Sequence, residues 1–254
     1  MNRSLTITFV CSACMSVCSA LLAENSQLPE YEVRRVTGKL EIDGLLDEPA
    51  WLAALPLGDF YFPWFKSGVR EQSLVKLAWD DEFLYVACVC QDAHIAAGHS
   101  HHDEPLASDD CFEIMLSPNR DRPAFYFNIE WNAIGGYVDG HRPNGADAPR
   151  VEWGARGVKL AGRHAGTLND DADKDTSWTA EVAIPWANFR EHLPHFPPRA
   201  GDEFRANFNR HGGLTNPQFS QWSSADTPAP AFHVPSRFGR LVLSPRTIPF
   251  ADER

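Results

Sequence analysis

Apolar and polar residues alternate along several short segments of the chain. In residues 178–184, Trp178, Ala180, Val182 and Ile184 occupy every second position. This period of two is typical of a β-strand with one buried face. An alternating segment at 73–79 and an apolar run at 83–91 flank the turn Asp80-Asp81-Glu82, which predicts a hairpin. Further strands are predicted at residues 111–116, 124–131, 204–210 and 238–243.

Helical patterns are confined to residues 48–54 and 186–189, each long enough for one or two turns. Many short strands separated by turn residues predict an all-β fold. We expect a two-sheet antiparallel β-sandwich of jelly-roll or immunoglobulin-like type, with one or two short helices. A chain of 254 residues fits one such domain, placed at 30–244 and followed by a C-terminal tail at 245–254.

The first 23 residues are typical of a secretory signal peptide. Arg3 supplies a positive charge, residues 5–22 carry none, and Ala20 and Ala23 are small residues near a cleavage point. The alternative is a transmembrane anchor. We expect a secreted or periplasmic protein that leaves the membrane after cleavage.

The formal net charge is −11. Nucleic acid binding requires clustered basic residues, so no nucleic acid partner is expected. The sequence gives no indication of the oligomeric state.

Three of the six cysteines lie in the predicted signal, which leaves Cys88, Cys90 and Cys111. Cys88 and Cys90 are two residues apart in one strand and share a face, so they cannot easily bridge each other. They either replace small core residues or offer one partner to Cys111.

Six segments in order resemble family 9 carbohydrate-binding modules. They are IDGLLDEPAW at 42–51, WDDEFLYV at 79–86, DDCFEI at 109–114, WTAEVAIPW at 178–186, and WS at 222–223 followed by PSRFG at 235–239. The resemblance implies a β-sandwich that binds a plant or algal polysaccharide or oligosaccharide and is not an enzyme.

The resemblance also implies a binding site. Glu113 matches a strand glutamate that bonds sugar hydroxyls, Asn132 matches an asparagine on the next strand, and Glu130 stands where known members have arginine. Phe232 occupies the position at which family members have one of the two tryptophans that sandwich a terminal sugar. The other tryptophan is expected just before Asp109, where residues 106–108 are Leu-Ala-Ser.

Other side chains are candidates for the same site. Trp64, Trp131 and Trp153 are candidates for the missing aromatic ring. Asn207 and Asn209 share one face of a strand and belong either to a binding surface or to a solvated one.

Two other functions remain open from the residues. Glu113, Glu130 and Glu181 allow a glycosidase with paired carboxylates, although the sequence contains no G-x-S-x-G elbow or Gly-rich phosphate loop. Some relatives of this sandwich are electron-transfer domains that hold a haem between a Met and a His ligand. Met115 is the one methionine outside the predicted signal. A sandwich that has lost sugar binding is a further alternative.

A histidine-rich segment near residue 100 is a weak candidate for a metal site. His99, His101 and His102 could bind Zn, Cu or Ni, or could lie in a polar loop. The resemblance implies structural calcium, for which the acidic pairs at 80–81, 109–110 and 170–171 offer oxygen ligands.

Overall fold

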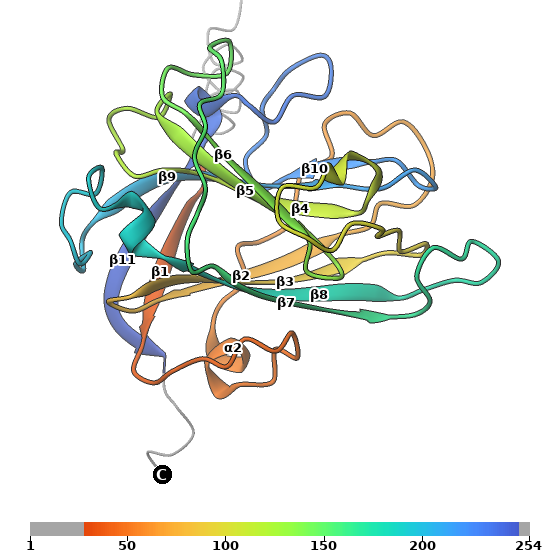
Figure 1. Cartoon of the computed structure of the whole chain (residues 1–254), viewed down its shortest axis with the longest axis horizontal. Helices are drawn as coiled ribbons and strands as arrows, with labels where there is room; N and C mark the ends of the chain where they lie inside the picture. The colour runs from red at the N-terminus through yellow and green to blue at the C-terminus, as the bar shows by residue number, and fades with distance from the viewer. Residues whose placement is uncertain (1–27, 249–254) are drawn as a thin grey trace, which may run out of the picture.

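The structure, a computed structural model, describes residues 28–248 and is built almost entirely from β-strands (Figure 1). The strands are β1 (Glu30–Val36), β2 (Ser73–Trp79), β3 (Phe83–Gln91), β4 (Cys111–Ser117), β5 (Tyr126–Asn132), β6 (Tyr137–Arg142), β7 (Lys159–Ala165), β8 (Ser177–Pro185), β9 (Glu203–His211), β10 (Phe219–Gln221) and β11 (Gly239–Ile248). The short helices are α2 (Pro49–Ala53) and three 3-10 turns, η2 (Leu106–Ser108), η3 (Trp186–Phe189) and η4 (Pro235–Arg237).

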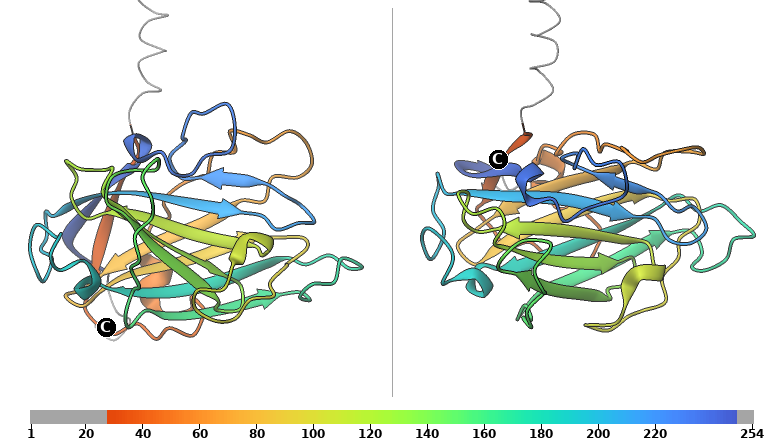
Figure 2. Two further views of the ribbon diagram at one scale, coloured as in Figure 1. Left: turned by 45° about the horizontal axis from the view of Figure 1, so that its top comes forward. Right: turned by 90° about the horizontal axis from the view of Figure 1, so that it is seen from above.

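All of these strands belong to one hydrogen-bonded sheet, in the order β6-β5-β4-β9-β11-β1-β2-β3-β8-β7, with β10 paired to β9. The sheet curls so that its two halves face each other, joined along one side by β11 and β1 (Figures 1 and 2). The all-β prediction is therefore confirmed. The division into two separate sheets is not confirmed, because the hydrogen bonds run continuously from one half to the other.

The joint between the halves also departs from a purely antiparallel arrangement. β1 runs parallel to both neighbours, β11 and β2. Its ladder with β2 has only two residue pairs, Arg34 with Ala78 and Arg35 with Trp79. So short a ladder lets the sheet direction change sharply between the halves.

The main hydrophobic core lies between the two halves. Trp178, Ala180, Val182 and Ile184 are all buried there, as their alternation predicted. The opposite half contributes alternate residues of β4, β5 and β9, including Phe112, Ile129 and Phe208. Because neighbouring residues of a strand point to opposite faces, the residues between these core positions face outward.

A second, smaller core lies outside the β2-β3-β8 half, beneath α2 (Figure 1). Trp51 of α2 is 1% exposed and packs there with Tyr85 and Ala183. Pro49 at the start of α2 suits the first helical turn, where no backbone donor is needed. Both predicted helical segments are confirmed as short helices, α2 and η3.

Four strands lacked a recognisable pattern in the sequence: β1, β6, β7 and β10. β7 is an exposed edge strand with no buried residue, so it shows no apolar alternation. β10 has three residues. β11 continues to Ile248, past the expected start of the tail, because residues 247–248 pair with Arg35 and Val36.

Cys88, Cys90 and Cys111 are free and buried in the structure. The predicted signal peptide at 1–23 lies outside the described residues. Between residues 28 and 248, no helix is long and apolar enough to cross a membrane.

Candidate functional site

A row of polar side chains crosses the outer face of the β5-β4-β9 half. Glu113 of β4 pairs with Glu130 of β5 on one side and with Asn209 of β9 on the other, and Asn209 pairs with Gln221 of β10. Side chains directly opposite each other in a sheet lie on the same face. The four residues therefore form one line across four strands, on the face away from the main core.

Three residues of this row, Glu113, Glu130 and Asn209, line a pocket of about 410 Å³. The pocket is also lined by residues of β6 and of the segments at 105–107, 150 and 232–233. The segment between β10 and β11, which contributes residues 232–233, is drawn in blue in Figure 2. A concave site with an apolar wall and a few converging polar groups is the usual form of a small-ligand site.

Hydrogen bonds along the row run in one direction. The Ala225 N–H donates to Gln221 Oε1 at 2.9 Å, and Gln221 Nε2 donates to Asn209 Oδ1 at 3.0 Å. Asn209 Nδ2 then donates to Glu113 Oε1 at 3.0 Å. Each amide thus accepts on its oxygen and donates from its nitrogen. The relay fixes the Glu113 carboxylate with one oxygen bonded and leaves the other as an acceptor for a ligand hydroxyl.

The two glutamates of the row affect each other's ionisation. Burial raises the pKa of Glu113 well above its ordinary value, and the facing charge of Glu130 raises it further, against the opposite influence of Asn209 and Arg142. Burial also raises the pKa of Glu130. Within residues 28–248 neither glutamate forms a salt bridge. The pocket therefore holds two carboxyl groups that favour the protonated state more than an exposed pair would.

One wall of the pocket is aromatic. The Phe219 and Phe232 rings are 5.8 Å apart, and Trp64 lies 6.1 Å from Phe232 and 6.4 Å from Phe219. His211 stacks on Phe219 at 5.1 Å with an interplanar angle of 5°. Flat rings of this kind present the apolar surface on which a sugar ring can stack.

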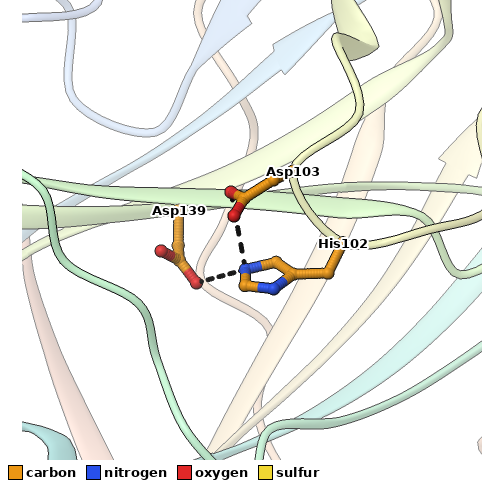
Figure 3. Close-up of side chains that lie close together, drawn as sticks. All are labelled: His102, Asp103 and Asp139. Atoms are coloured by element: carbon orange, nitrogen blue, oxygen red, sulfur yellow. Dashed lines mark hydrogen bonds and ion pairs between the residues drawn. The ribbon is translucent and has the colours of Figure 1, made fainter.

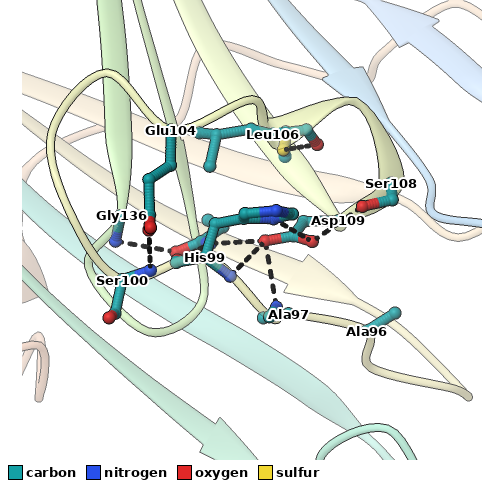
Figure 4. Close-up of polar contacts among 12 residues, drawn as sticks. Ala96, Ala97, His99, Ser100, Glu104, Leu106, Ser108, Asp109 and Gly136 are labelled. Atoms are coloured by element: carbon teal, nitrogen blue, oxygen red, sulfur yellow. Dashed lines mark hydrogen bonds and ion pairs between the residues drawn. The ribbon is translucent and has the colours of Figure 1, made fainter.

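Another part of the lining is aliphatic and is made by Pro105, Leu106 and Ala107. The Asp109 N–H donates to the Leu106 carbonyl at 2.9 Å, and the Asp109 carboxylate, which is 3% exposed, accepts from the Gly98 and His99 N–H groups and from Asn132 Nδ2 (Figure 4). Burial opposes ionisation of Asp109, but these donors outweigh it and keep its pKa below the ordinary value. The wall that would carry the second tryptophan is thus ordered but has no aromatic ring.

The pocket is also lined by two arginines that the sequence did not indicate, Arg142 and Arg150. Arg142 Nη1 donates to the Ala146 and Ala148 carbonyls, each at 3.2 Å. A Cβ at Gly140 would lie 2.5 Å from Arg150 Nε, so the Arg150 side chain lies directly over Gly140 and would have to shift if a larger residue stood there. Gly140 was the one local indication that another side chain could lie over this strand. It could not be interpreted because β6 itself was not predicted.

The structure brings together four of the six predicted sugar-binding residues: Glu113, Glu130, Asn209 and Phe232 all line the pocket. Asn132 and Asn207 do not. Asn132 bonds to the His99 carbonyl, to Asp109 and to the N–H groups of residues 134 and 136. Asn207 is 1% exposed and bonds to both backbone groups of Ser223.

The three tryptophan candidates lie in different places. Trp131 is fully buried in the main core, and Trp153 packs on Phe127 and Phe189. Trp64 is the one of the three that contacts Phe232. It thickens the aromatic wall rather than replacing the missing opposite ring.

The histidine-rich segment does not form one cluster. His99 Nδ1 lies 3.1 Å from Asp109 Oδ1, and His101 Nδ1 lies 3.3 Å from Glu104 Oε2. His102 Nε2 contacts Asp139 Oδ2 of β6 at 2.9 Å (Figure 3). Each histidine thus has its own carboxylate partner.

The acidic pairs suggested for calcium use their oxygens within the protein. Asp80 accepts from the Glu82 and Phe83 N–H groups and from the Tyr85 hydroxyl, and Asp110 accepts from two backbone N–H groups. A different carboxylate group, Asp43, Glu48 and Glu181, has oxygens within 4.8 Å of one another. Glu48 Oε2 is buried without a hydrogen-bond partner among the described residues, but both Glu181 oxygens already accept from protein donors, so the set does not offer three free ligand oxygens.

The structure also locates the residues on which the glycosidase and haem alternatives depend. Glu181 lies on β8 in the other half of the sheet, fully buried beneath α2, so it does not share the pocket with Glu113. Met115 is buried against Tyr126 and Phe238.

Similar proteins agree with the predicted family. The carbohydrate-binding family 9 profile matches residues 52–243. A putative carbohydrate-binding protein from Bacteroides uniformis superposes with a TM-score of 0.72 at 22% identity, covering 86% of this chain and 100% of its own. A search among curated proteins finds no match.

Two further similar structures are of a family 9 carbohydrate-binding module from Caldicellulosiruptor kristjanssonii. The complex with cellotriose has a TM-score of 0.58 at 20% identity and covers 85% of this chain and 94% of its own. The complex with glucose has a TM-score of 0.57 at 19% identity and covers 87% of this chain and 99% of its own. These likenesses show a shared fold, and the profile spans most of the chain. The chain belongs to carbohydrate-binding family 9, a non-catalytic family.

Proposed function

We propose that the chain binds the end of a plant or algal polysaccharide or oligosaccharide in the pocket over β5, β4 and β9, and does not cleave it. The observation that carries the proposal is Glu113. Its carboxylate is held by Asn209 on one oxygen and faces a pocket with an aromatic wall. Such a group is suited to accept hydrogen bonds from adjacent sugar hydroxyls while a ring stacks beside it.

Two features support weak binding. The pocket has one aromatic wall, so one face of the sugar can stack while the other meets aliphatic side chains. Glu113 can bond only a few hydroxyls, with Arg142 and Arg150 as additional donors. We expect dissociation constants from micromolar to millimolar, roughly −4 to −8 kcal/mol.

Calorimetric titration with glucose, cellotriose and a panel of plant and algal oligosaccharides tests the proposal. Glu113→Gln should weaken binding roughly 5- to 100-fold for any sugar that the parent binds. Glu191→Gln, a change at an exposed glutamate outside the pocket, should bind as the parent does. Equal binding by all three proteins would place the ligand elsewhere.

The non-catalytic part of the proposal has its own test. Xylan, cellulose and mixed-linkage glucan incubated with the protein should release no reducing sugar. Release that disappears in Glu113→Gln or Glu130→Gln would instead indicate a glycosidase that uses this carboxyl pair.

Export is a further part of the proposal and rests on residues 1–23. Protein recovered from the producing cell should begin near Glu24 and lie outside the cytoplasm. N-terminal sequencing that returns Met1 from the cytosol would contradict it.

A further inference from the structure

A histidine and two aspartates converge beside the first residues of β6. His102 Nε2 lies 2.9 Å from Asp139 Oδ2 and 3.6 Å from Asp103 Oδ1 (Figure 3). One ligand atom from each of the three side chains lies within 4.8 Å of the other two. The cluster is separate from the sugar pocket, because Val138 lines the pocket and neighbouring residues of a strand face opposite sides.

Asp139 is the residue in this cluster that points to a ligand. It is 0% exposed, and its Oδ2 accepts from the Ala155 N–H at 3.0 Å as well as contacting His102. Its Oδ1 is buried and has no hydrogen-bond partner in the described part of the chain. A buried carboxylate oxygen without a donor costs free energy. A cation bound at Oδ2 would stabilise the charge of this buried carboxylate, which the protein compensates on that one oxygen only.

The other two side chains are held in place by β6. The His102 ring stacks on Tyr137, with centroids 4.2 Å apart and an interplanar angle of 20°. The Asp103 N–H donates to the Tyr137 carbonyl at 2.9 Å. The His102 ring, the Asp139 carboxylate and the backbone of Asp103 are therefore positioned before any ligand arrives, which lowers the ordering cost of binding.

We propose that His102, Asp103 and Asp139 bind a divalent transition metal ion of the zinc type, with water completing the coordination. Zn–N and Zn–O bonds of about 2.0–2.2 Å in tetrahedral geometry separate neighbouring ligand atoms by about 3.4 Å. The two measured N···O distances, 2.9 and 3.6 Å, fall on either side of that value. Shifts of about 0.5 Å would therefore admit the ion.

The ligand chemistry selects the class of ion. One imidazole nitrogen and two carboxylate oxygens suit zinc and its first-row neighbours, whereas calcium takes six to eight oxygens. His102 would coordinate through Nε2 and keep its proton on Nδ1. His101 offers a contrast within the same segment, because it faces the single carboxylate of Glu104 and is 80% exposed.

Zinc titration of the full chain, stripped with EDTA and dialysed, tests the proposal. Calorimetry should give one equivalent of Zn²⁺ per chain, and Co²⁺ should give visible d–d absorption. His102→Ala and Asp103→Asn should each weaken Zn²⁺ binding at least tenfold. Because both side chains are partly exposed, circular dichroism should show both variants folded.

His101→Ala is the matched control and should retain the full zinc equivalent. Zinc binding by His102→Ala as tight as that of the parent would overturn the proposal, as would parent protein that binds no zinc. Equal losses in His101→Ala and His102→Ala would also overturn it, because they would indicate adventitious binding by the histidine-rich segment. Sugar titrations should be unchanged in His102→Ala.

Discussion

Glu113 and Glu181 are both buried glutamates on inner strands of the sheet, yet their surroundings differ. Glu181 is 0% exposed, and its carboxylate accepts three protein donors: the Asp43 and Gly44 N–H groups and Trp51 Nε1. Glu113 is 6% exposed and accepts one, from Asn209, while the charge of Glu130 faces it. One carboxylate is satisfied by the fold, and the other is only partly satisfied.

The difference separates a structural carboxylate from the one that we propose to bind sugar. Burial of a charge is expensive unless hydrogen bonds compensate it. Three donors compensate at Glu181, and they tie the turn at 43–44 and α2 to β8. At Glu113 the protein leaves acceptor capacity open at the base of a pocket. Five substitutions test this contrast, in four experiments that run from the largest expected effect to the smallest.

Glu181→Ala should cause the largest change, a loss of stability. It leaves three donors without their acceptor, and each buried unsatisfied donor costs about 1–3 kcal/mol. We expect the free energy of unfolding to fall by about 3 kcal/mol or more, with the thermal midpoint lower by about 6 °C or more. Urea and thermal unfolding measure this. A midpoint within 2 °C of the parent's would show that the three bonds contribute little.

Glu113→Gln should weaken sugar binding without this loss of stability. The glutamine oxygen still accepts from Asn209, so the relay along the row survives, but the second acceptor becomes an amide donor. A sugar hydroxyl left without its acceptor costs about 1–3 kcal/mol, so affinity should fall roughly 5- to 100-fold. Titration and thermal melting together check this. Unfolding of the variant would mean that Glu113 is structural, as Glu181 is.

Phe232→Ala should weaken binding about tenfold, because it removes a stacking ring worth ~1.5 kcal/mol. Trp64→Phe is the companion variant: it keeps a ring behind Phe232 and should change affinity less. Its lost bond to the Thr227 carbonyl should lower the thermal midpoint slightly. A larger effect from Trp64→Phe than from Phe232→Ala would mean that Trp64 itself contacts the sugar.

Glu130→Gln should give the smallest change, a gain in stability that depends on pH. The folded pKa values of Glu113 and Glu130 lie above their unfolded values. Their contribution to stability is therefore fully present below the unfolded pKa, and it is lost as pH rises through the folded pKa. Removing one charge relieves this loss. The midpoint should rise by about 2–4 °C near pH 8, as ~1 kcal/mol implies, and be unchanged near pH 4.

Thermal melts across this pH range measure the effect. A variant whose stability falls with pH as steeply as the parent's would show that the two carboxyl groups do not repel each other in the folded protein.

The candidate site was predictable only in part. Glu113 and Phe232 could be identified because each falls at a recognisable place in a family motif. Asn132 was named for the same reason, but Asp109 and three neighbouring backbone groups use its hydrogen bonds. A strand pattern indicates which face a side chain occupies. It does not indicate whether its partners come from the protein or from a ligand.

The sequence by itself determined the strand-rich fold and the family, because local alternation, turn residues and ordered motifs are all written in short segments. It also determined the main core, since alternate residues of a strand must share a face. Only the tertiary structure decided that β1 and β11 join the halves into one curled sheet. It alone brought Arg142, Arg150 and Phe219 to the pocket, and Asp139 to His102. These are contacts between distant segments, and strand register and loop paths set them, which no local pattern encodes.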